Sequence, residues 1–466
     1  MKTETLATTI WLLSILFLMA PATNAADQTD AIKNGLDAIS EARIKQTVQF
    51  LSSDEMAGRD TPSPELKKAA EYVAQRFKQA GLNPGVDDSF FQIAQIATTT
   101  LDNESVQLKV AGTDVKHYGL LGAGREPFSF TGKLVAGDPD DRSQRYTGPV
   151  RFQAGEIESP ADELQISRMI GRLKRRGATA VLIEVKPNSR LIATAARSGL
   201  PRIIDPRGKF SVPTLLVSKL DPNANYEIKV PAVKNGATDV RNVIGVLPGS
   251  DPALRSEAII ISAHLDHIGQ QLGLKDPVFN GADDNASGVT VVLALAEAYA
   301  ALPTPPKRSV IFMTFWGEEK GLLGSRHYAN NPTWPLENTV ANINLEMMGR
   351  PQPGASGKCW MTGWEHSDLG KHMAIGAKEA GVEIFEHPRF SNMLYRASDN
   401  ASFVDKGVIG HSFSAGSLHS DYHKPGDEWE KLEIKHMAAV TRGLLAGSYK
   451  IANGELTPQK QQRRRR

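Results

Sequence analysis

The sequence contains a single cysteine, Cys359, and almost no excess charge of either sign. One thiol cannot form an internal disulfide, and it excludes a zinc site built from several cysteines. The 54 lysines and arginines against 52 acidic residues leave a net charge of +2, so no global basic field indicates a nucleic-acid binder. The 466 residues, 41% of them hydrophobic and 23% charged, have an ordinary globular composition with room for two or three domains.

A long apolar run occurs only near the start of the sequence, from Leu6 to Ala20. It is too short to cross about 30 Å of hydrocarbon as a helix, and small residues follow it at 22–26, as is typical of a secretory signal. We therefore expect residues 1–25 to be a signal peptide and the mature protein to be secreted or periplasmic, with no stable membrane span. An uncleaved anchor is the alternative.

Residues 26–100 are interpreted as N-terminal helices that join the main domain, with helical character from Asp27 to about Gln95. Ser63 is a good N-cap, Pro64 suits a first helical turn, and apolar residues follow at helical spacing. Gly81 is expected to end that helix.

Residues 101–235 change in character, with short strand-like runs and many glycines and prolines. One helix is predicted near Glu163–Arg176, running into a buried-strand pattern at 177–183. We expect this segment to be a smaller α+β lobe inserted before the main domain. At the other end of the chain, residues 456–466 form a basic tail in which Arg463–Arg466 are read as a solvated terminus.

Residues 236–455 repeat a pattern of apolar strand, loop and helix, which predicts an α/β domain with a mostly parallel central sheet covered by helices on both faces. In such sheets ligands bind beyond the carboxyl ends of the strands. The predicted strands are Ala258–Ser262, Val310–Phe315, Val340–Leu345 and Val408–Phe413.

Imidazole and carboxylate groups follow the predicted strands and the loop before the first long helix. These groups are His264, Asp266, Asp284, Glu318, Glu319, Glu346 and His423. Nitrogen and oxygen donors without sulfur suit zinc, and so many acidic groups in one crevice repel each other unless cations neutralise them. A pair of ions about 3.5–4 Å apart would polarise a carbonyl and activate a water between them.

Two adjacent glutamates could have different roles in such a site. If Glu318 and Glu319 continue a strand, they point to opposite sides, so that one can bind metal while the other moves protons. His264 and Asp266 would then share a side, and Asp266 could orient the imidazole.

Five stretches, "AHLDH", "GADDNASG", "FWGEEKGLLGS", "NLEMMG" and "SDYHKPGDEWEKL", resemble in order and spacing the di-zinc exopeptidases that include bacterial leucyl aminopeptidase, glutamate carboxypeptidase and, more distantly, glutaminyl cyclase. The resemblance covers about Val240–Ile451 and extends to "LSSDEMAGRD". The inserted lobe resembles a protease-associated (PA) domain through "RRGATAVLIEV" and "SVPTLLVS".

The resemblance implies two Zn²⁺ ions per chain and a role for each matching residue. One ion would bind His264, Asp284 and Glu346, and the other would bind Asp284, Glu319 and His423. Glu318 would be the general base, and Asp266 would orient His264. The family most often has Asp where this chain has Glu346. The remaining histidines near these motifs, His267, His411 and His419, are interpreted as structural.

These roles predict an exported zinc exopeptidase that acts on peptides through a hydroxide bridging two metals, and an aminopeptidase in particular. A carboxypeptidase or dipeptidase on the same scaffold is the first alternative, with Arg396 as the candidate group for a substrate carboxylate. Glutaminyl cyclase activity and a non-catalytic binding ectodomain are further alternatives, although the ligand set and the base are complete. The sequence does not predict an oligomeric state.

Overall fold

The computed structural model describes residues 25–461, apart from 156, 158–159, 188, 197–201, 204–211, 272–274 and 417. The predicted signal peptide lies outside the described residues except for Ala25, and the arginine run Arg463–Arg466 lies outside them entirely. Within the described part of the chain, no helix combines the length and the apolar character needed to span a membrane.

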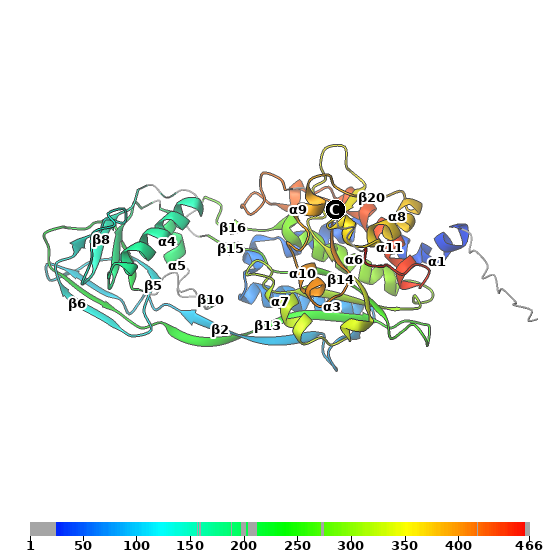
Figure 1. Cartoon of the computed structure of the whole chain (residues 1–466), viewed down its shortest axis with the longest axis horizontal. Helices are drawn as coiled ribbons and strands as arrows, with labels where there is room; N and C mark the ends of the chain where they lie inside the picture. The colour runs from blue at the N-terminus through cyan, green and yellow to red at the C-terminus, as the bar shows by residue number, and fades with distance from the viewer. Residues whose placement is uncertain are drawn as a thin grey trace, which may run out of the picture.

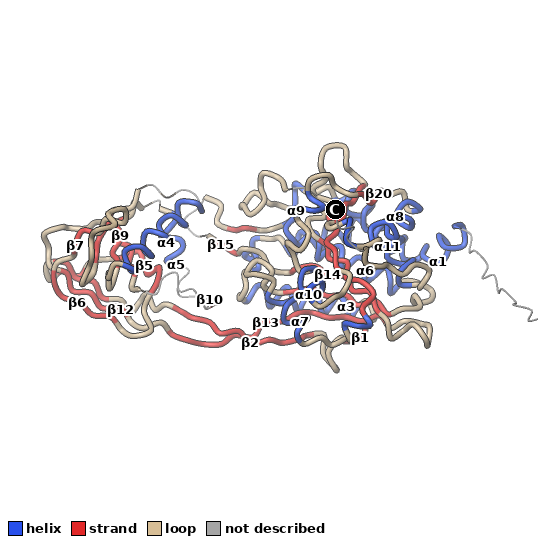
Figure 2. Tube along the Cα trace, in the orientation of Figure 1, coloured by secondary structure: helices blue, strands red, loops and turns tan. Residues whose placement is uncertain are grey.

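A large mixed sheet organises the main domain (Figures 1 and 2). Its four central strands run parallel, whereas strands nearer the edges pair antiparallel with them. In order across the sheet, the described strands are β10 (Arg202–Ile203), β2 (Phe91–Thr100), β13 (Lys234–Leu247), β17 (Ser309–Phe315), β14 (Ala258–His264), β18 (Thr339–Leu345), β21 (Gly410–Ser414), β19 (Lys358–Met361) and β20 (Glu383–Phe385), with β1 (Asn83–Pro84) paired to β13.

Helices cover both faces of this sheet, and each face has its own core. In β14, Ile259 and Ile261 belong to the larger core, and Ile260 belongs to the smaller one. The helices that contribute to the larger core are α1 (Ala25–Ala38), α2 (Glu41–Leu51), α3 (Pro64–Gln79), α6 (Gly288–Ala300), α8 (Leu369–Glu379) and α11 (Ile434–Ala452). Those that contribute to the smaller core are α7 (Leu323–Asn330) and α10 (Asn400–Asp405). Every residue of β14 and β17 is buried, which explains their unbroken apolar sequences. The predicted fold class is confirmed.

The entry helices follow the expected local rules as far as α3. The Ser63 hydroxyl accepts a hydrogen bond from the backbone N–H of Leu66, and Pro64 occupies the first turn. The helical prediction up to Gln95 is wrong at its end, because β1 and β2 follow α3. Alternate residues of β2 are more exposed, and this period of two is typical of a half-buried strand.

Residues between β2 and β13 form a second lobe, which lies to one side of the main domain in Figure 1. Two small sheets and two helices enclose apolar cores of their own. The first sheet contains, in order, β5 (His117–Gly122), β11 (Thr214–Val217), β9 (Val181–Glu184), β8 (Val150–Gln153) and β7 (Val135–Ala136). The second sheet contains β4 (Thr113–Asp114), β3 (Gln107–Val110), β12 (Tyr226–Val230) and β6 (Phe128–Gly132). The two helices are α4 (Pro160–Arg175) and α5 (Arg190–Ala196). Its likeness to a PA domain stays a prediction.

A two-stranded ribbon joins the lobe to the main domain. β2 and β13 pair antiparallel from Phe91 opposite Val243 to Thr100 opposite Lys234, and the pairing continues into the large sheet. β2 therefore ends at the predicted boundary after residue 100, β13 runs across the one between residues 235 and 236, and the lobe is tethered by continuous hydrogen-bonded backbone (Figure 2).

Candidate metal centre

The predicted metal ligands meet at the carboxyl ends of the central strands. His264 is the last residue of β14, and Glu346 follows β18 directly. Asp284 lies in the short irregular helix η3 (Ala282–Ser287) that precedes α6. Glu319 and His423 lie in the loops after β17 and β21. Parallel strands place all these segments at one edge of the sheet, which is why residues as far apart as His264 and His423, 159 positions, come together.

Two groups of side chains share Asp284. In the first, the Nε2 atom of His264 lies 3.3 Å from Oδ1 of Asp284 and 3.3 Å from Oε2 of Glu346. In the second, Nε2 of His423 lies 3.0 Å from Oδ2 of Asp284 and 3.3 Å from Oε1 of Glu319. Each Asp284 oxygen thus faces a different group, which is the arrangement of a bridging carboxylate.

The longer side chain of Glu346 is accommodated by hydrogen bonds to one of its oxygens. Asn344 Nδ2 donates to Oε1 of Glu346 at 2.9 Å, and the hydroxyl of Ser398 donates to the same atom. These bonds leave Oε2 directed at His264. The extra methylene relative to Asp is therefore compatible with a ligand position.

The structure also places His267 in the second group, where sequence reasoning gave it a structural role. Its Nδ1 atom lies 2.9 Å from Oε1 of Glu319 and 3.8 Å from Oδ2 of Asp284, and its ring is fully buried. The available signal was the second histidine of "AHLDH", three residues after His264. A histidine after a strand is common, so the sequence alone did not separate this one from buried structural histidines.

The donor atoms of both groups fit zinc. Bonds of about 2.0–2.2 Å in a tetrahedral arrangement place neighbouring donor atoms about 3.3 Å apart, close to the separations found here. Moreover, Oδ2 of Asp284, Oε1 of Glu319 and Nδ1 of His267 are buried with no hydrogen-bond partner among the described residues. Buried polar atoms without partners are rare, and here they converge on one point, as ligands of a cation would.

The metal-free centre carries strongly shifted titrating groups. Burial acts to lower the pKa of His264, but the carboxylates of Glu346 and Glu318 outweigh it and hold that pKa well above its ordinary value. In the same way, burial opposes and the carboxylates of Asp284 and Glu319 raise the pKa of His423 to about 10. Burial would raise the pKa of Glu319, yet the imidazoles of His267 and His423 bring it to about 2. The imidazoles of His264 and His423 are therefore protonated at neutral pH when no cation is bound, and they pair with carboxylates.

Zinc binding is expected to release about two protons per chain near pH 7. A zinc-bound imidazole nitrogen must be deprotonated, and the raised pKa values of His264 and His423 mean that both rings start with the extra proton. The apparent zinc affinity should therefore rise with pH, by about tenfold per unit for each proton released. Calorimetric titrations in buffers of different ionisation enthalpy measure this proton count. A binding heat that is independent of the buffer would contradict the protonated metal-free state, and Mg²⁺, which prefers oxygen ligands, is the control ion.

Glu318 lies beside both groups but belongs to neither of the clusters of donor atoms. It follows β17 in a turn, so the predicted strand alternation does not apply; the turn itself separates Glu318 from Glu319. Burial, reinforced by the carboxylates of Glu346 and Asp399, raises the pKa of Glu318 well above its ordinary value. A raised pKa suits a group that accepts a proton and passes it on.

Asp266 contacts His264 and Glu318 in different ways. Its backbone oxygen, rather than its carboxylate, lies 3.0 Å from Nδ1 of His264; the carboxylate oxygen is 3.9 Å away. The carboxylate accepts hydrogen bonds from the backbone N–H of Glu318 at 3.1 Å and from the hydroxyl of Thr61 at 3.0 Å. Burial raises the pKa of Asp266 to about 6. The residue thus positions both the turn that carries Glu318 and the imidazole of His264, and Thr61 is a partner that sequence reasoning missed.

Arg59 holds the backbone around the centre in place through hydrogen bonds. This side chain is fully buried, and it donates hydrogen bonds to the backbone oxygens of Leu51, Leu265, Asn280 and Gly281. Those oxygens belong to the end of α2 and to the two loops that present the ligands. The short helix η1 (Asp54–Arg59) therefore ties the N-terminal helices to the metal centre.

The cavity at the centre is lined by both acidic and apolar side chains. Its volume is about 100 Å³. The lining residues that the structure describes are His264, Asp284, Glu318, Glu319, Glu346, Met347, Trp360, Thr362, Leu394, Ala397, Ser398, Ser412, Ser414, Leu418, Tyr422 and His423. No arginine or lysine occurs among them.

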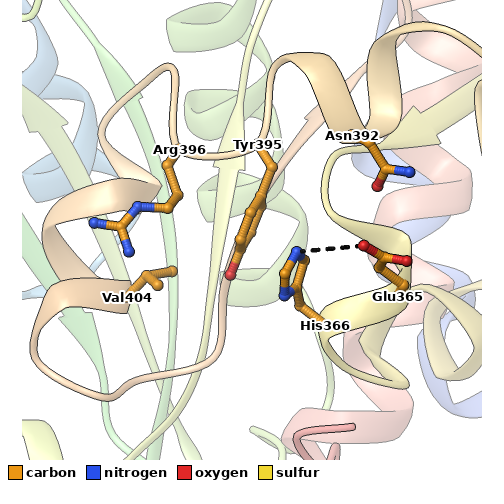
Figure 3. A pocket seen from close by; sticks show the side chains of 6 residues that line it. All are labelled: Glu365, His366, Asn392, Tyr395, Arg396 and Val404. Carbon is orange, nitrogen blue, oxygen red and sulfur yellow. Dashed lines mark ion pairs between the residues drawn. The ribbon is translucent and has the colours of Figure 1, made fainter. Parts of the chain in front are cut away.

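Arg396, the candidate for binding a substrate carboxylate, lies elsewhere. It is half-exposed and forms an ion pair with Asp405. Figure 3 shows it in a separate surface pocket with Tyr395, Val404, Asn392 and the ion-paired residues Glu365 and His366. The position of Arg396 gives no support to a carboxypeptidase.

Known proteins resemble this chain both in sequence and in structure. The model of the family described as peptidase family M28 matches residues 242–447. Aminopeptidase YwaD of Bacillus subtilis is 25% identical over 299 residues, which are 60% of this chain and 59% of that protein. Leupeptin-inactivating enzyme 1 of Streptomyces exfoliatus is 29% identical over 167 residues, 36% of this chain and 35% of that protein. The chain thus spans at most about three fifths of these two relatives.

A solved structure shares the fold over most of the chain. The zinc aminopeptidase BSAP from Bacillus subtilis superposes with a TM-score of 0.57 and 18% identity, covering 92% of this chain and 97% of that one. The matched family segment begins in β13, ends in α11 and contains all the residues of the two ligand groups. Residues 242–447 of this chain therefore form a domain that belongs to peptidase family M28.

Proposed function

We propose that this chain is an exported aminopeptidase that binds two zinc ions and removes N-terminal residues from peptides. The observation that carries the proposal is the cavity itself, in which Asp284 is shared by two groups of donor atoms and Glu318 lies free beside them. Export is supported by the apolar run from Leu6 to Ala20 and the small residues after it.

His264, Asp284 and Glu346 would hold one ion, and Asp284, Glu319 and His423 the other. When bound, two such ions polarise a scissile carbonyl and lower the pKa of a water placed between them. Glu318 would accept a proton from the attacking water, because it lies beside both groups without belonging to either and because burial raises its pKa above the ordinary value. The same carboxyl group would then donate the proton to the departing amine. Asp266 keeps Glu318 in place through the backbone N–H of that residue.

The lining of the cavity favours a substrate with a free amino terminus over one recognised by its carboxylate. Two zinc ions would offset the charge of the four lining carboxylates, and the described lining residues include no lysine or arginine to pair with a substrate carboxylate. Apolar side chains of Met347, Trp360 and Leu394 line the rest of the cavity. We therefore expect an apolar residue to be preferred at the substrate's N-terminus.

A panel of matched substrates tests the proposal. Leucyl-p-nitroanilide, its N-acetyl derivative and an N-blocked dipeptide with a free carboxyl terminus would be compared at equal concentration. We expect the free-amine substrate to be cleaved at least about 100-fold faster than either blocked one, since N-acetylation removes the free amine that an aminopeptidase must bind. A chelator should abolish activity, and zinc should restore it. Faster cleavage of the N-blocked dipeptide would instead establish a carboxypeptidase.

A further inference from the structure

We propose that His267 is a fourth protein ligand of the metal position formed by Asp284, Glu319 and His423. The inference rests on the proposed two-metal function and adds a residue to it. It makes the two metal positions unequal, with two imidazoles and two carboxylates at this one and a single imidazole with two carboxylates at the other.

The distances around His267 match those expected between ligands of one ion. Its Nδ1 atom lies 2.9 Å from Oε1 of Glu319 and 3.8 Å from Oδ2 of Asp284. Nε2 of His423 lies 3.3 Å and 3.0 Å from the same two oxygens. These four separations bracket the value of about 3.3 Å for tetrahedral zinc ligands. The two imidazole rings stand edge to face, with centroids 5.6 Å apart, so neither ring blocks the other.

The ring nitrogens of His267 are both buried, and neither has a hydrogen-bond partner among the described residues. The distance from Nδ1 to Oε1 of Glu319 is nonetheless short. A buried polar atom without a partner is destabilising, because it has lost its hydrogen bonds to water. Coordination through Nδ1 would satisfy one of these nitrogens together with the unpartnered oxygens of Asp284 and Glu319.

The surrounding backbone holds the ring in this position. Gly281 packs against it with a positive φ of 57°, and a Cβ atom there would lie 2.5 Å from the imidazole. The backbone N–H of His267 donates to the backbone oxygen of Arg59. Gly281 thus leaves room for the ring, and Arg59 fixes the main chain that carries it.

Unequal ligand sets predict unequal metal positions. A position with four protein donors would hold zinc through more bonds than one with three, and a water shared by both ions would be one further ligand of each. The position containing His267 should therefore bind zinc more tightly, and the position formed by His264, Asp284 and Glu346 should lose its ion first to a chelator.

Zinc competition titrations of the full chain and of two variants test the inference. His267→Phe keeps the ring volume and removes the donor, and His267→Ala removes both. We expect two zinc ions in the parent, and in each folded variant a loss of affinity of at least about 10-fold at one of them. His411→Phe is the matched control, because His411 is also buried but already pairs with Ser367 and Thr362. The control should keep both affinities.

Proton NMR of the cobalt-loaded parent chain provides a second test that needs no variant. Each imidazole bound to Co²⁺ contributes a strongly shifted, exchangeable N–H signal, so three such signals are expected if His264, His267 and His423 are all ligands. Two signals, or His267 variants that keep both zinc affinities, would overturn the inference and leave the proposed function intact. A parent chain that binds no stoichiometric zinc would instead contradict the proposed function and the inference together.

Discussion

Replacing Glu318 by Gln is expected to lower kcat by about 10²–10⁴-fold, the range that a general base commonly contributes. Gln has almost the same shape but cannot accept the proton of the attacking water. Glu318 belongs to neither group of donor atoms, so zinc content should stay at two ions per chain. Steady-state kinetics on leucyl-p-nitroanilide, together with elemental analysis of the same sample, measures both quantities.

The control for this variant is Glu365→Gln. Glu365 is an exposed glutamate in the separate pocket of Figure 3, and its replacement should leave kcat unchanged. A Glu318→Gln enzyme that retains its full rate would remove the residue from the mechanism. A Glu318→Gln enzyme that loses zinc would make it a ligand instead of a base.

Replacing Asp284 by Asn should have an even broader effect, because both groups of donor atoms depend on this carboxylate. Its two oxygens face His264 on one side and His423 on the other. An amide has one oxygen and no charge, so it cannot bridge two cations. We expect zinc affinity to fall by at least about 100-fold at both positions, and activity to fall to background at micromolar zinc.

The comparison that separates this effect from a general loss of charge is Asp405→Asn. Asp405 is an exposed aspartate paired with Arg396, away from the cavity. This control should retain two zinc ions and full activity. An Asp284→Asn chain that still binds two ions with parent affinity would refute the bridging role, whichever residues proved to be catalytic.

Local rules account for much of the fold. Ser63 and Pro64 mark the start of α3 through capping, an interaction between residues within one turn. The apolar runs that became β14, β17 and β18 identify buried strands, because both faces of those strands are covered. The entry into β2 was missed because its alternating pattern is weak beside the helical pattern before it.

Much of the candidate site could likewise be predicted from the sequence. A parallel sheet brings the ends of its strands to one edge, so the residues that follow each strand could be grouped before any distance was known. That rule is topological: it predicted which segments meet, and the structure places His264, Asp284, Glu319, Glu346 and His423 within a few ångströms.

Everything that depends on side-chain direction was decided by the tertiary structure. His267 has the same sequence context as a buried structural histidine, and only the packing of Gly281 and the loop after β17 turns its ring toward Glu319. The charge of Arg396 made it a candidate for binding a substrate carboxylate, but the structure places this residue in another pocket. Sequence patterns report the period of an element and the order of segments, whereas these contacts join residues from separate segments whose orientation is set by the whole core.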